Sequence, residues 1–441
     1  MEQRSVALPS VRRASRFGWP FGSSCEGRTV RKRYGTPPGY RVNLKVDMAL
    51  FARRACPICS GHEPHVLFRQ SFEQLSDARL VAGYDVVVCA DCGAGFADGI
   101  PEQATFDRYY RELSKYDYND RIVAQRPKVD RRFVDTADSM QKSIPSRHAR
   151  ILEIGSASGE LLNVLAERGF TNLVGVDPSP GCCRAAREIY GIECHVGTVF
   201  VMPLIRHAHD FLILVGVMEH IRDIDIAARR LRSLLGAHGR VYLEVPDASR
   251  FTAAADAPFQ EFSVEHVNFL SLQSLTNLML INGFRPIETG RAVRGLNDIA
   301  VPVAYGCYEK TSESGPIVKD METEPALRAY IAGGLEEDSR IRAKIEGAIG
   351  PGERIIVWGV GTHTQRLLAN GGLNPEKVAL FVDSNAKYQR QHLLGIPVVA
   401  PEELRDRSEA ILISSRGLQQ EIYGQIRQRL AIPNTVIRLY T

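Results

Sequence analysis

The chain has 441 residues, of which 44% are hydrophobic and 24% are charged. This length predicts two to four domains, and the composition is that of a soluble globular protein and excludes a chain that is disordered throughout. No apolar run approaches the roughly 18 residues of a membrane span, so we expect no membrane partner.

The net charge of +4 is concentrated near the N-terminus. Met1 to Asp47 holds ten Lys or Arg against three Asp or Glu, so the rest of the chain is slightly acidic. This Pro-, Gly- and Arg-rich stretch, residues 1–47, predicts a disordered basic leader, and we therefore expect no nucleic-acid partner. No apolar segment follows Arg12 and Arg13, so no export signal is predicted, and Met48 is an alternative start.

Residues 48–120 are predicted to form a small zinc-binding module. The stretches "CPICSG" and "CADCGAGF" each contain a Cys-x-x-Cys pair. Each pair can aim two sulfurs at one ion, so Cys56, Cys59, Cys89 and Cys92 are predicted to ligate a structural zinc. The long spacing between the pairs requires a helix or hairpin, and free or redox-active thiols are the alternative. The other cysteines show no pairing pattern, so a reducing compartment, the cytoplasm, is expected.

Residues 121–310 alternate between strand and helix patterns. "ARILEIGSASGELLNVLAERGFTNLVGVDPSP" predicts a strand, a glycine turn, a helix and a second strand that ends at an aspartate. In an open parallel sheet such a turn borders the ligand crevice, and the aspartate can accept hydrogen bonds from ribose hydroxyls. A nicotinamide cofactor is the first alternative, but the turn lacks G-x-G-x-x-G. The predicted cofactor-binding residues are Glu153, Gly155, Ser156, Ala157, Gly159, Asp177 and Pro178.

The turn has the form E-x-G-x-x-x-G and resembles motif I of the class I S-adenosylmethionine-dependent methyltransferases. "HDFLILVGVMEHIRD" and "RVYLEVP" resemble later segments of that family. The resemblance implies an α/β, Rossmann-like methyltransferase domain that binds S-adenosylmethionine, with Glu153 as a buried acid beneath the turn. Ala157 stands where many members have glycine, and its methyl group is expected to be tolerated if the backbone is not left-handed. A Rossmann-like domain without this cofactor is the alternative.

Two Glu-His pairs are the catalytic candidates. Glu219 and His220 follow the strand in "DFLILVGVM", and Glu265 and His266 precede the helix "SLQSLTNLML". Both pairs are predicted to reach the same rim of the crevice. A neutral imidazole can remove a proton near neutral pH, and a neighbouring carboxylate can orient it. The alternative is loop support at the start of the helix, which Ser271 marks.

The C-terminal part comprises a linker and charged helix, residues 311–349, and a second Rossmann-like domain, residues 350–441. "RIIVWGVGTHTQRLL" predicts a strand, a glycine turn and a helix, and a second strand ends in Asp383. Gly359 and Gly361 could cradle a phosphate at the helix N-terminus. A scaffolding role for this domain is the alternative that we favour.

The three parts together resemble the sugar C-methyltransferases that act on nucleotide-linked 4-keto-6-deoxysugars. The resemblance runs from about Ala55 to Leu439 and includes "DRYYRELSKYDYND", "EIGSASG", "VEHVNFLS" and "VWGVGTHTQRLL". It implies a small-molecule substrate, removal of the proton beside the ketone and attack of the enolate carbon on the cofactor's methyl group. The catalytic residues that it implies are His266 as the base, with Glu265, His220 and one tyrosine of the "YDY" stretch, Tyr116 or Tyr118, lining the substrate pocket.

Ser263 departs from the family pattern. Sugar C-methyltransferases commonly have a tyrosine at this position, two residues before the glutamate of the Glu-His pair. The keto-sugar substrate therefore has an alternative, O-methylation of a sugar or polysaccharide precursor, in which His266 would deprotonate a hydroxyl group. A nucleotide-binding or zinc-dependent interaction protein without catalysis is a third possibility, and packing is the alternative role of the two tyrosines.

Overall fold

The fold comes from a computed structural model of the chain. It describes residues 53–76, 80–112, 130–202, 208–254, 256–296 and 299–440. The predicted leader, Tyr116 and Tyr118 lie outside the described residues. Within the described part of the chain, no helix is both long and apolar enough to cross a membrane.

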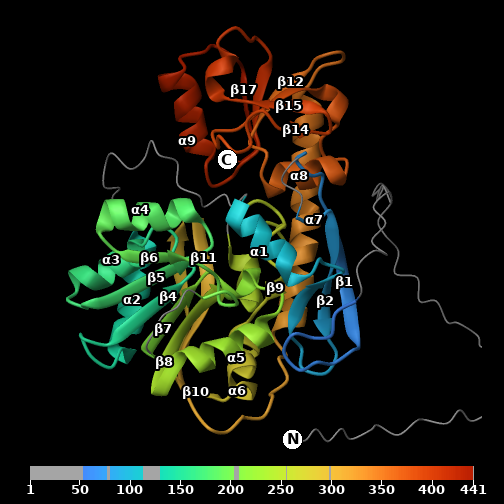
Figure 1. The fold of residues 1–441 in the computed structure, drawn as a ribbon. Helices are drawn as coiled ribbons and strands as arrows, with labels where there is room; N and C mark the ends of the chain where they lie inside the picture. The colour runs from blue at the N-terminus through green and yellow to red at the C-terminus, as the bar shows by residue number, and fades with distance from the viewer. Residues whose placement is uncertain are drawn as a thin grey trace, which may run out of the picture. The chain divides into compact units, whose positions relative to one another are not determined.

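The N-terminal sheet has four strands in the order β1-β2-β3-β9, and all of its neighbours are antiparallel (Figure 1). A β1–β2 hairpin fills the interval between the two cysteine pairs, as their spacing predicts. The last strand comes from far along the chain and follows the second Glu-His pair directly. The elements are β1 (Pro64–Ser71), β2 (Gly83–Cys89), β3 (Gly95–Asp98), β9 (Asn268–Phe269) and the following helix α1 (Gln103–Glu112).

The central sheet has seven strands in the order β10-β11-β8-β7-β4-β5-β6. Five neighbouring strands, from β8 to β6, are parallel, and β10 and β11 form an antiparallel hairpin at one edge. The chain runs outward from β4 through β5 to β6 and then returns to β7, so the topological switch point lies between β4 and β7. The strands are β4 (Arg150–Ile154), β5 (Asn172–Asp177), β6 (Glu193–Val196), β7 (His209–Val215), β8 (Leu235–Pro246), β10 (Phe284–Leu296) and β11 (Ile299–Lys310).

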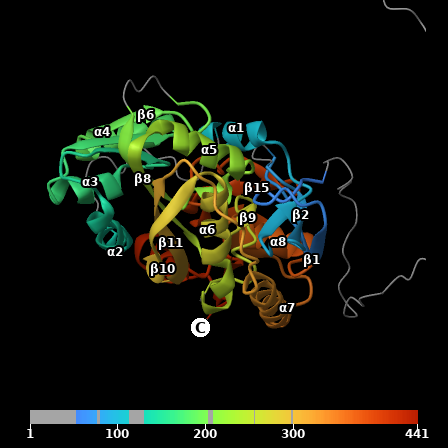
Figure 2. The same cartoon turned by 90° about the horizontal axis from the view of Figure 1, so that it is seen from below.

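Helices cover both faces of this sheet (Figure 2). Phe211 and Ile213 of β7 pack in one apolar cluster with α2, α3 and α4, whereas Leu212 and Leu214 pack in another with α5 and α6. This split follows from the period of two in a β-strand, which sends successive side chains to opposite faces. The helices are α2 (Arg131–Met140), α3 (Glu160–Glu167), α4 (Pro180–Tyr190), α5 (Ile224–Leu234) and α6 (Leu272–Ile281).

The C-terminal sheet has six strands in the order β14-β15-β13-β12-β16-β17, and only the β14–β15 pair is antiparallel. The glycine turn and helix follow β12, as the sequence predicts. Helix α7 (Thr323–Ala348) precedes this unit. Asp320 fixes the start of this helix, because its Oδ1 accepts the amide groups of Glu322 and Thr323 at 2.9 and 3.0 Å. The other elements are α8 (Thr362–Ala369), α9 (Gln419–Gly424), β12 (Ile355–Trp358), β13 (Val378–Val382), β14 (His392–Leu393), β15 (Ile396–Val399), β16 (Ala410–Ile413) and β17 (Val436–Arg438).

A buried ion pair joins α7 to α8. The Arg366 guanidinium, which is 1% exposed, donates through Nη1 to Asp338 Oδ2 at 2.6 Å and also contacts Oδ1. It lies 4.7 Å from the ring centroid of Phe259, which belongs to the segment before the second Glu-His pair. Short helical turns complete the fold: η2 (Gln141–Ser143), η3 (Met218–His220), η4 (Ala248–Ala253), η5 (Pro375–Lys377), η6 (Pro401–Leu404) and the π-helical η7 (Gln425–Arg429).

Candidate active site

A glycine turn connects β4 to α3 at the topological switch point. Gly155 and Gly159 have φ angles of 76° and 81°, which glycine adopts without Cβ strain. A Cβ atom on Gly155 would lie 2.5 Å from Cγ2 of Val217, just beyond the end of β7. The turn is therefore in contact with the carboxyl end of the neighbouring strand, where ligands bind in open α/β sheets.

The amide groups of the turn are bonded within the protein. Those of Gly155 and Ser156 donate to the carbonyl of Val176 at 2.7 and 3.1 Å, and that of Ala157 donates to Asp177 Oδ2 at 2.9 Å. A dinucleotide needs several such groups directed at its pyrophosphate. The amides of Gly155, Ser156 and Ala157 are therefore not directed at a ligand.

Asp177 lies at the end of β5, as predicted. Its Oδ1 accepts the amide of Ser179 at 2.8 Å, while its Oδ2 accepts that of Ala157, so the carboxylate ties two loops together. A carboxylate at the end of this strand is placed to accept ribose hydroxyls. Pro178 lies between these two loop contacts and is half-buried.

Ala157 adopts a left-handed backbone with φ of 44°. The methyl group was expected to be tolerated only if the backbone was not left-handed, and this requirement is not met. In the left-handed region Cβ crowds the following carbonyl. The conformation costs an L-residue about 1–2 kcal/mol. The bond from the Ala157 amide to Asp177 holds the residue in this conformation.

Glu153 lies beneath the turn and is 4% exposed. Its Oε2 has no hydrogen-bond partner among the residues that the structure describes. Burial, followed by the proximity of Cys194 and Asp177, raises the pKa of this carboxyl well above its usual value. A buried carboxyl with an unpartnered oxygen is compatible with a ligand that supplies the missing partner.

The structure brings the two predicted histidines together. The ring centroids of His220 and His266 are 4.8 Å apart, and the rings meet edge to face. His220 Nδ1 lies 2.9 Å from the hydroxyl of Tyr110 and 3.2 Å from the carbonyl oxygen of Glu265. A proton on Nδ1 would be donated to the carbonyl, whereas a proton on Nε2 would leave Nδ1 to accept the Tyr110 hydroxyl. His266 Nδ1 lies 3.4 Å from Oε2 of Glu261.

Glu219 completes this cluster. Its Oε1 is 3.9 Å from Nε2 of His220. A carboxylate oxygen of Glu219, a ring nitrogen of His220 and a ring nitrogen of His266 all lie within 4.8 Å of one another. The Glu219 side chain is 5% exposed, and across the described ranges Oε2 accepts no hydrogen bond. Burial raises the pKa of Glu219 to about 7, against the opposing effect of His266. The carboxyl therefore changes its protonation near neutral pH, next to two imidazoles.

A serine shapes the loop that carries His266. The hydroxyl oxygen of Ser263 accepts the amide groups of Glu265 at 3.3 Å and His266 at 3.1 Å, which turns the chain back on itself. The Ser263 carbonyl in turn accepts the hydroxyl of Tyr84, on β2, at 2.8 Å. The N-terminal sheet therefore supports the loop directly.

Arg54 forms a second connection between the N-terminal module and this loop. Its guanidinium donates to the carbonyls of Arg222 and Val267 and to Oδ1 of Asn268, at 2.8, 2.9 and 2.9 Å. Burial lowers the pKa of Arg54 to about 9. The Asn268 amide donates to the carbonyl of Met218 at 2.9 Å, so the segments that contain the two Glu-His pairs are bound to each other.

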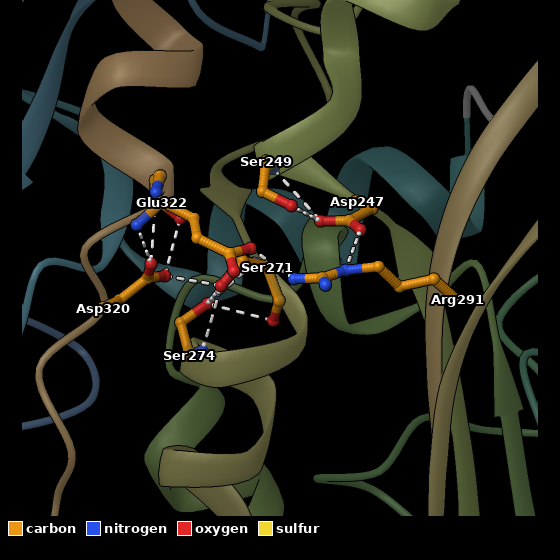
Figure 3. A network of polar contacts seen from close by, with 8 residues as sticks. Asp247, Ser249, Ser271, Ser274, Arg291, Asp320 and Glu322 are labelled. Carbon is orange, nitrogen blue, oxygen red and sulfur yellow. Dashed lines mark hydrogen bonds and ion pairs between the residues drawn. The ribbon is translucent and has the colours of Figure 1, made fainter.

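Helix α6 begins directly after the loop, as predicted. Ser271 and Ser274 form a capping box, in which each side chain accepts the other residue's amide. The Ser271 hydroxyl also donates to Asp320, the residue that caps α7 (Figure 3). Nearby in the same view, Arg291 of β10 pairs with the buried carboxylate of Asp247 at 3.0 Å. The far end of the loop is thus fixed to two helices.

Sequence reasoning missed two tyrosines of α1 that reach the histidine cluster. The hydroxyl of Tyr109 donates to Oε1 of Glu265 at 2.9 Å, and Tyr110 contacts His220. Both belong to the same tyrosine-rich stretch as Tyr116 and Tyr118, the tyrosines that the family resemblance implied. Tyr116 and Tyr118 lie outside the described residues. The only sequence signal for the helical pair was that shared stretch.

The four predicted cysteines converge. Sγ of Cys56 is 3.6 Å from Sγ of Cys92, and Sγ of Cys59 is 3.4 Å from Sγ of Cys89, so each short distance joins the two Cys-x-x-Cys turns. One sulfur from each of the four lies within 4.8 Å of the others. This is the donor set and the convergence that a four-thiolate metal site requires.

Residues 124–289 match a protein family described as "Methyltransferase domain". The chain carries an S-adenosylmethionine-dependent methyltransferase domain. The matched residues include the cofactor turn and both Glu-His pairs. Residues 352–437 match a second family, described as "C2185-like, N-terminal". Among proteins of curated function, none matches the chain.

Solved methyltransferase structures cover about two fifths of this chain. The YcgJ protein of Bacillus subtilis is 14% identical and covers 41% of this chain and 99% of its own, with a TM-score of 0.34. A methyltransferase of Mesorhizobium loti is 12% identical, with coverages of 39% and 96% and a TM-score of 0.33. A possible histamine N-methyltransferase of Thermotoga maritima is 20% identical, with coverages of 41% and 89% and a TM-score of 0.33. Similarities at this level carry no conclusion about the substrate of the methyltransferase domain.

Proposed function

We propose that the protein methylates a carbon atom of a nucleotide-linked keto-deoxysugar through a base-generated enolate. The main support is the position of the histidine cluster. Val217 touches Gly155 of the cofactor turn and directly precedes η3, which carries Glu219 and His220. Groups that can accept a proton therefore lie next to the predicted methyl donor, and the three-part sequence resemblance supplies the substrate class.

His266 acts as the base in this proposal. S-adenosylmethionine, when bound, supplies an electrophilic methyl group. The imidazole of His266 takes the proton from the sugar carbon beside the ketone, and the electron pair of the broken C–H bond moves into the enolate. The cofactor would give its methyl group to the enolate carbon and would leave as the neutral thioether, with the electrons of its C–S bond on sulfur. The ketone is essential because an unactivated C–H bond is far too weak an acid for imidazole.

An enolate also needs a partner for its oxygen. Tyr110 and His220, which contact each other at 2.9 Å, are the groups that we propose for this role. Glu265 holds α1 against the site through Tyr109. Tyr116 and Tyr118 stay predictions as further residues of the substrate pocket.

The cofactor residues stay as predicted. The turn would surround the methionine part of the cofactor, and the carboxylate of Asp177 at the end of β5 would accept the ribose hydroxyls. The buried carboxyl of Glu153 has an unpartnered oxygen that the ligand would contact. The full set is Glu153, Gly155, Ser156, Ala157, Gly159, Asp177 and Pro178.

We propose that Cys56, Cys59, Cys89 and Cys92 bind one structural zinc. Four thiolates leave no open coordination position, so the metal would have no catalytic role. The expected result is one equivalent of zinc per chain, and Cys89→Ser should lose both the metal and the folded N-terminal module. A second equivalent of metal that survives in Cys89→Ser would place an ion among Glu219, His220 and His266, and would contradict the role of His266 as a base.

The C-terminal domain has a supporting role in this proposal. Asp383 Oδ2 accepts the amide of Val360 in the glycine turn at 3.1 Å, so at least part of this turn is also bonded internally. Arg366 of α8 packs on Phe259 and thus contacts the segment that leads to His266. These contacts favour support of the active-site loop over a second cofactor site.

O-methylation of a sugar hydroxyl is the second candidate. The observation that favours it is Ser263, which stands where the keto-sugar enzymes commonly have a tyrosine. In this reaction His266 would deprotonate a hydroxyl group, and no enolate oxygen would need stabilisation.

Solvent exchange separates the two reactions. We would incubate the zinc-loaded enzyme in D₂O with nucleotide-linked 4-keto-6-deoxysugars and follow the hydrogen beside the ketone by NMR. The proposal predicts exchange that requires His266 and, with S-adenosylmethionine, a product with a new C–C bond. His266→Gln should lower the rate by about 10²–10⁴-fold, whereas the exposed control His148→Gln should leave it unchanged. Methylation without exchange, on oxygen, would support the second candidate instead.

A further inference from the structure

The glutamate next to His266 in the sequence is not the carboxylate next to it in space. Oε1 of Glu265 accepts the hydroxyl of Tyr109 at 2.9 Å, and the side chain is buried against α1. The backbone carbonyl of Glu265 contacts His220 in the histidine cluster. The carboxylate oxygen of Glu265 that accepts the Tyr109 hydroxyl is directed at α1.

A different carboxylate lies beside the imidazole. Oε2 of Glu261 is 3.4 Å from Nδ1 of His266, and the two side chains are only 10% and 20% exposed. This oxygen is buried and has no hydrogen-bond partner within the described parts of the chain. A movement of a few tenths of an ångström would close a hydrogen bond, and catalytic hydrogen bonds are often long before the substrate binds.

We propose that Glu261 is the positioning residue for His266, the carboxylate that holds its Nδ1–H and leaves Nε2 as the basic nitrogen. This inference rests on the proposed function of His266 as the base. A carboxylate at Nδ1 fixes the tautomer and the ring orientation, and it stabilises the imidazolium that forms when Nε2 takes a proton. Glu261 itself touches neither substrate nor cofactor in this role.

The fold explains why Glu261 faces His266. Ser263 accepts the amide groups of residues 265 and 266, so the chain reverses and brings position 261 opposite position 266. The amide of Glu261 donates to the hydroxyl of Tyr330, on α7, at 3.1 Å. Phe262 packs on the same tyrosine with ring centroids 5.2 Å apart, which fixes the backbone on the other side of Glu261.

The charged groups around this pair come from several elements. Glu219 and His220 reach His266 from η3, and Tyr110 reaches His220 from α1. Asp256 and Tyr330 face Glu261, since each has its pKa raised in part by that carboxylate, although burial is the larger cause for both. Glu261 is the only carboxylate for which an ion-pair distance to His266 is found in the described residues.

The sign of the expected effect follows from this arrangement. A negative carboxylate favours the charged imidazolium, so it raises the pKa of His266 and makes Nε2 a stronger base. Glu261→Gln keeps the shape but removes the charge, and it should lower the pKa of His266 by about one pH unit. The acid limb of the pH-rate profile should move to lower pH by the same amount, and kcat should fall about tenfold.

NMR titration of the free enzyme tests the inference without a substrate. The zinc-loaded full chain would be labelled at the histidine ring carbons, and His266→Gln would identify the His266 signal. The expected result is a lower His266 pKa and a mixed tautomer in Glu261→Gln. Glu265→Gln, which removes the carboxylate adjacent in sequence, should have a clearly smaller effect on both. Glu261→Asp, which keeps the charge, should recover at least part of the shift.

Two results would overturn the inference. One is an unchanged His266 titration in Glu261→Gln with a folded protein by circular dichroism. The other is an equal or larger effect of Glu265→Gln. The outcome is separable from the proposed function: if the titration shifts as expected but no keto-sugar exchanges its hydrogen, the positioning by Glu261 stands and the substrate class falls.

Discussion

Replacement of Glu219 by glutamine should stabilise the protein, and increasingly so as the pH rises. Burial of this carboxyl raises its pKa from 4.5 to about 7. The folded state therefore holds the proton more tightly than the unfolded state, and the stability that this provides is complete below pH 4.5 and is lost as the pH rises to about 7. The difference corresponds to about 3 kcal/mol of unfolding free energy. Glutamine has the shape of the protonated acid and carries no charge, so Glu219→Gln avoids this loss.

Urea unfolding between pH 4.5 and pH 8 provides the assay. The free energies of unfolding of wild type and Glu219→Gln should nearly coincide at pH 4.5 and differ by up to about 3 kcal/mol at pH 8, in favour of the variant. Glu402→Gln is a suitable control, because this exposed side chain pairs with Arg429 at 3.1 Å and should contribute less than about 1 kcal/mol at any pH. A difference between wild type and Glu219→Gln that does not depend on pH would refute the reasoning, since it would mean that Glu219 ionises normally in the folded state.

Three further substitutions follow from local geometry. Ala157→Gly removes Cβ from a left-handed position and should raise the free energy of unfolding in urea by up to about 1 kcal/mol; a lower value would show that the methyl group's packing outweighs its strain. Ser263→Ala leaves two loop amides without their acceptor and should cost about 1 kcal/mol in thermal unfolding, whereas an unchanged melting temperature would mean that water replaces the hydroxyl. Arg366→Met leaves the Asp338 carboxylate buried without its partner and should cost about 3–5 kcal/mol, most of which Arg366→Met/Asp338→Leu should restore if charge burial is the cause.

Much of the fold could be predicted from the sequence because its signals are local. The strand, glycine turn and helix around Gly155 depend on hydrophobic period and on residues that tolerate positive φ. The start of α6 depends on two serines three positions apart. Each Cys-x-x-Cys turn predicts two convergent sulfurs, because the two intervening residues fix the distance between the cysteines of the pair.

The local signals were less informative where the backbone conformation depends on its surroundings. From the sequence alone, the backbone conformation of Ala157 could not be predicted. The hydrogen bond from its amide to Asp177, twenty residues away, selects the left-handed conformation. The tyrosine-rich stretch indicated that a phenol would reach the site. It could not show that Tyr109 and Tyr110 would do so, since their partners lie more than 100 positions further along the chain.

The sequence by itself determined the cofactor-type turn, the four converging cysteines and the two Glu-His pairs as candidates. Only the tertiary structure decided which carboxylate faces which imidazole. Adjacent residues in a loop need not point the same way, and here Ser263 turns the chain so that Glu265 faces α1 while Glu261 faces His266. The protonation of Glu219 likewise depends on desolvation by elements distant in the chain, and a sequence motif carries no information about that burial.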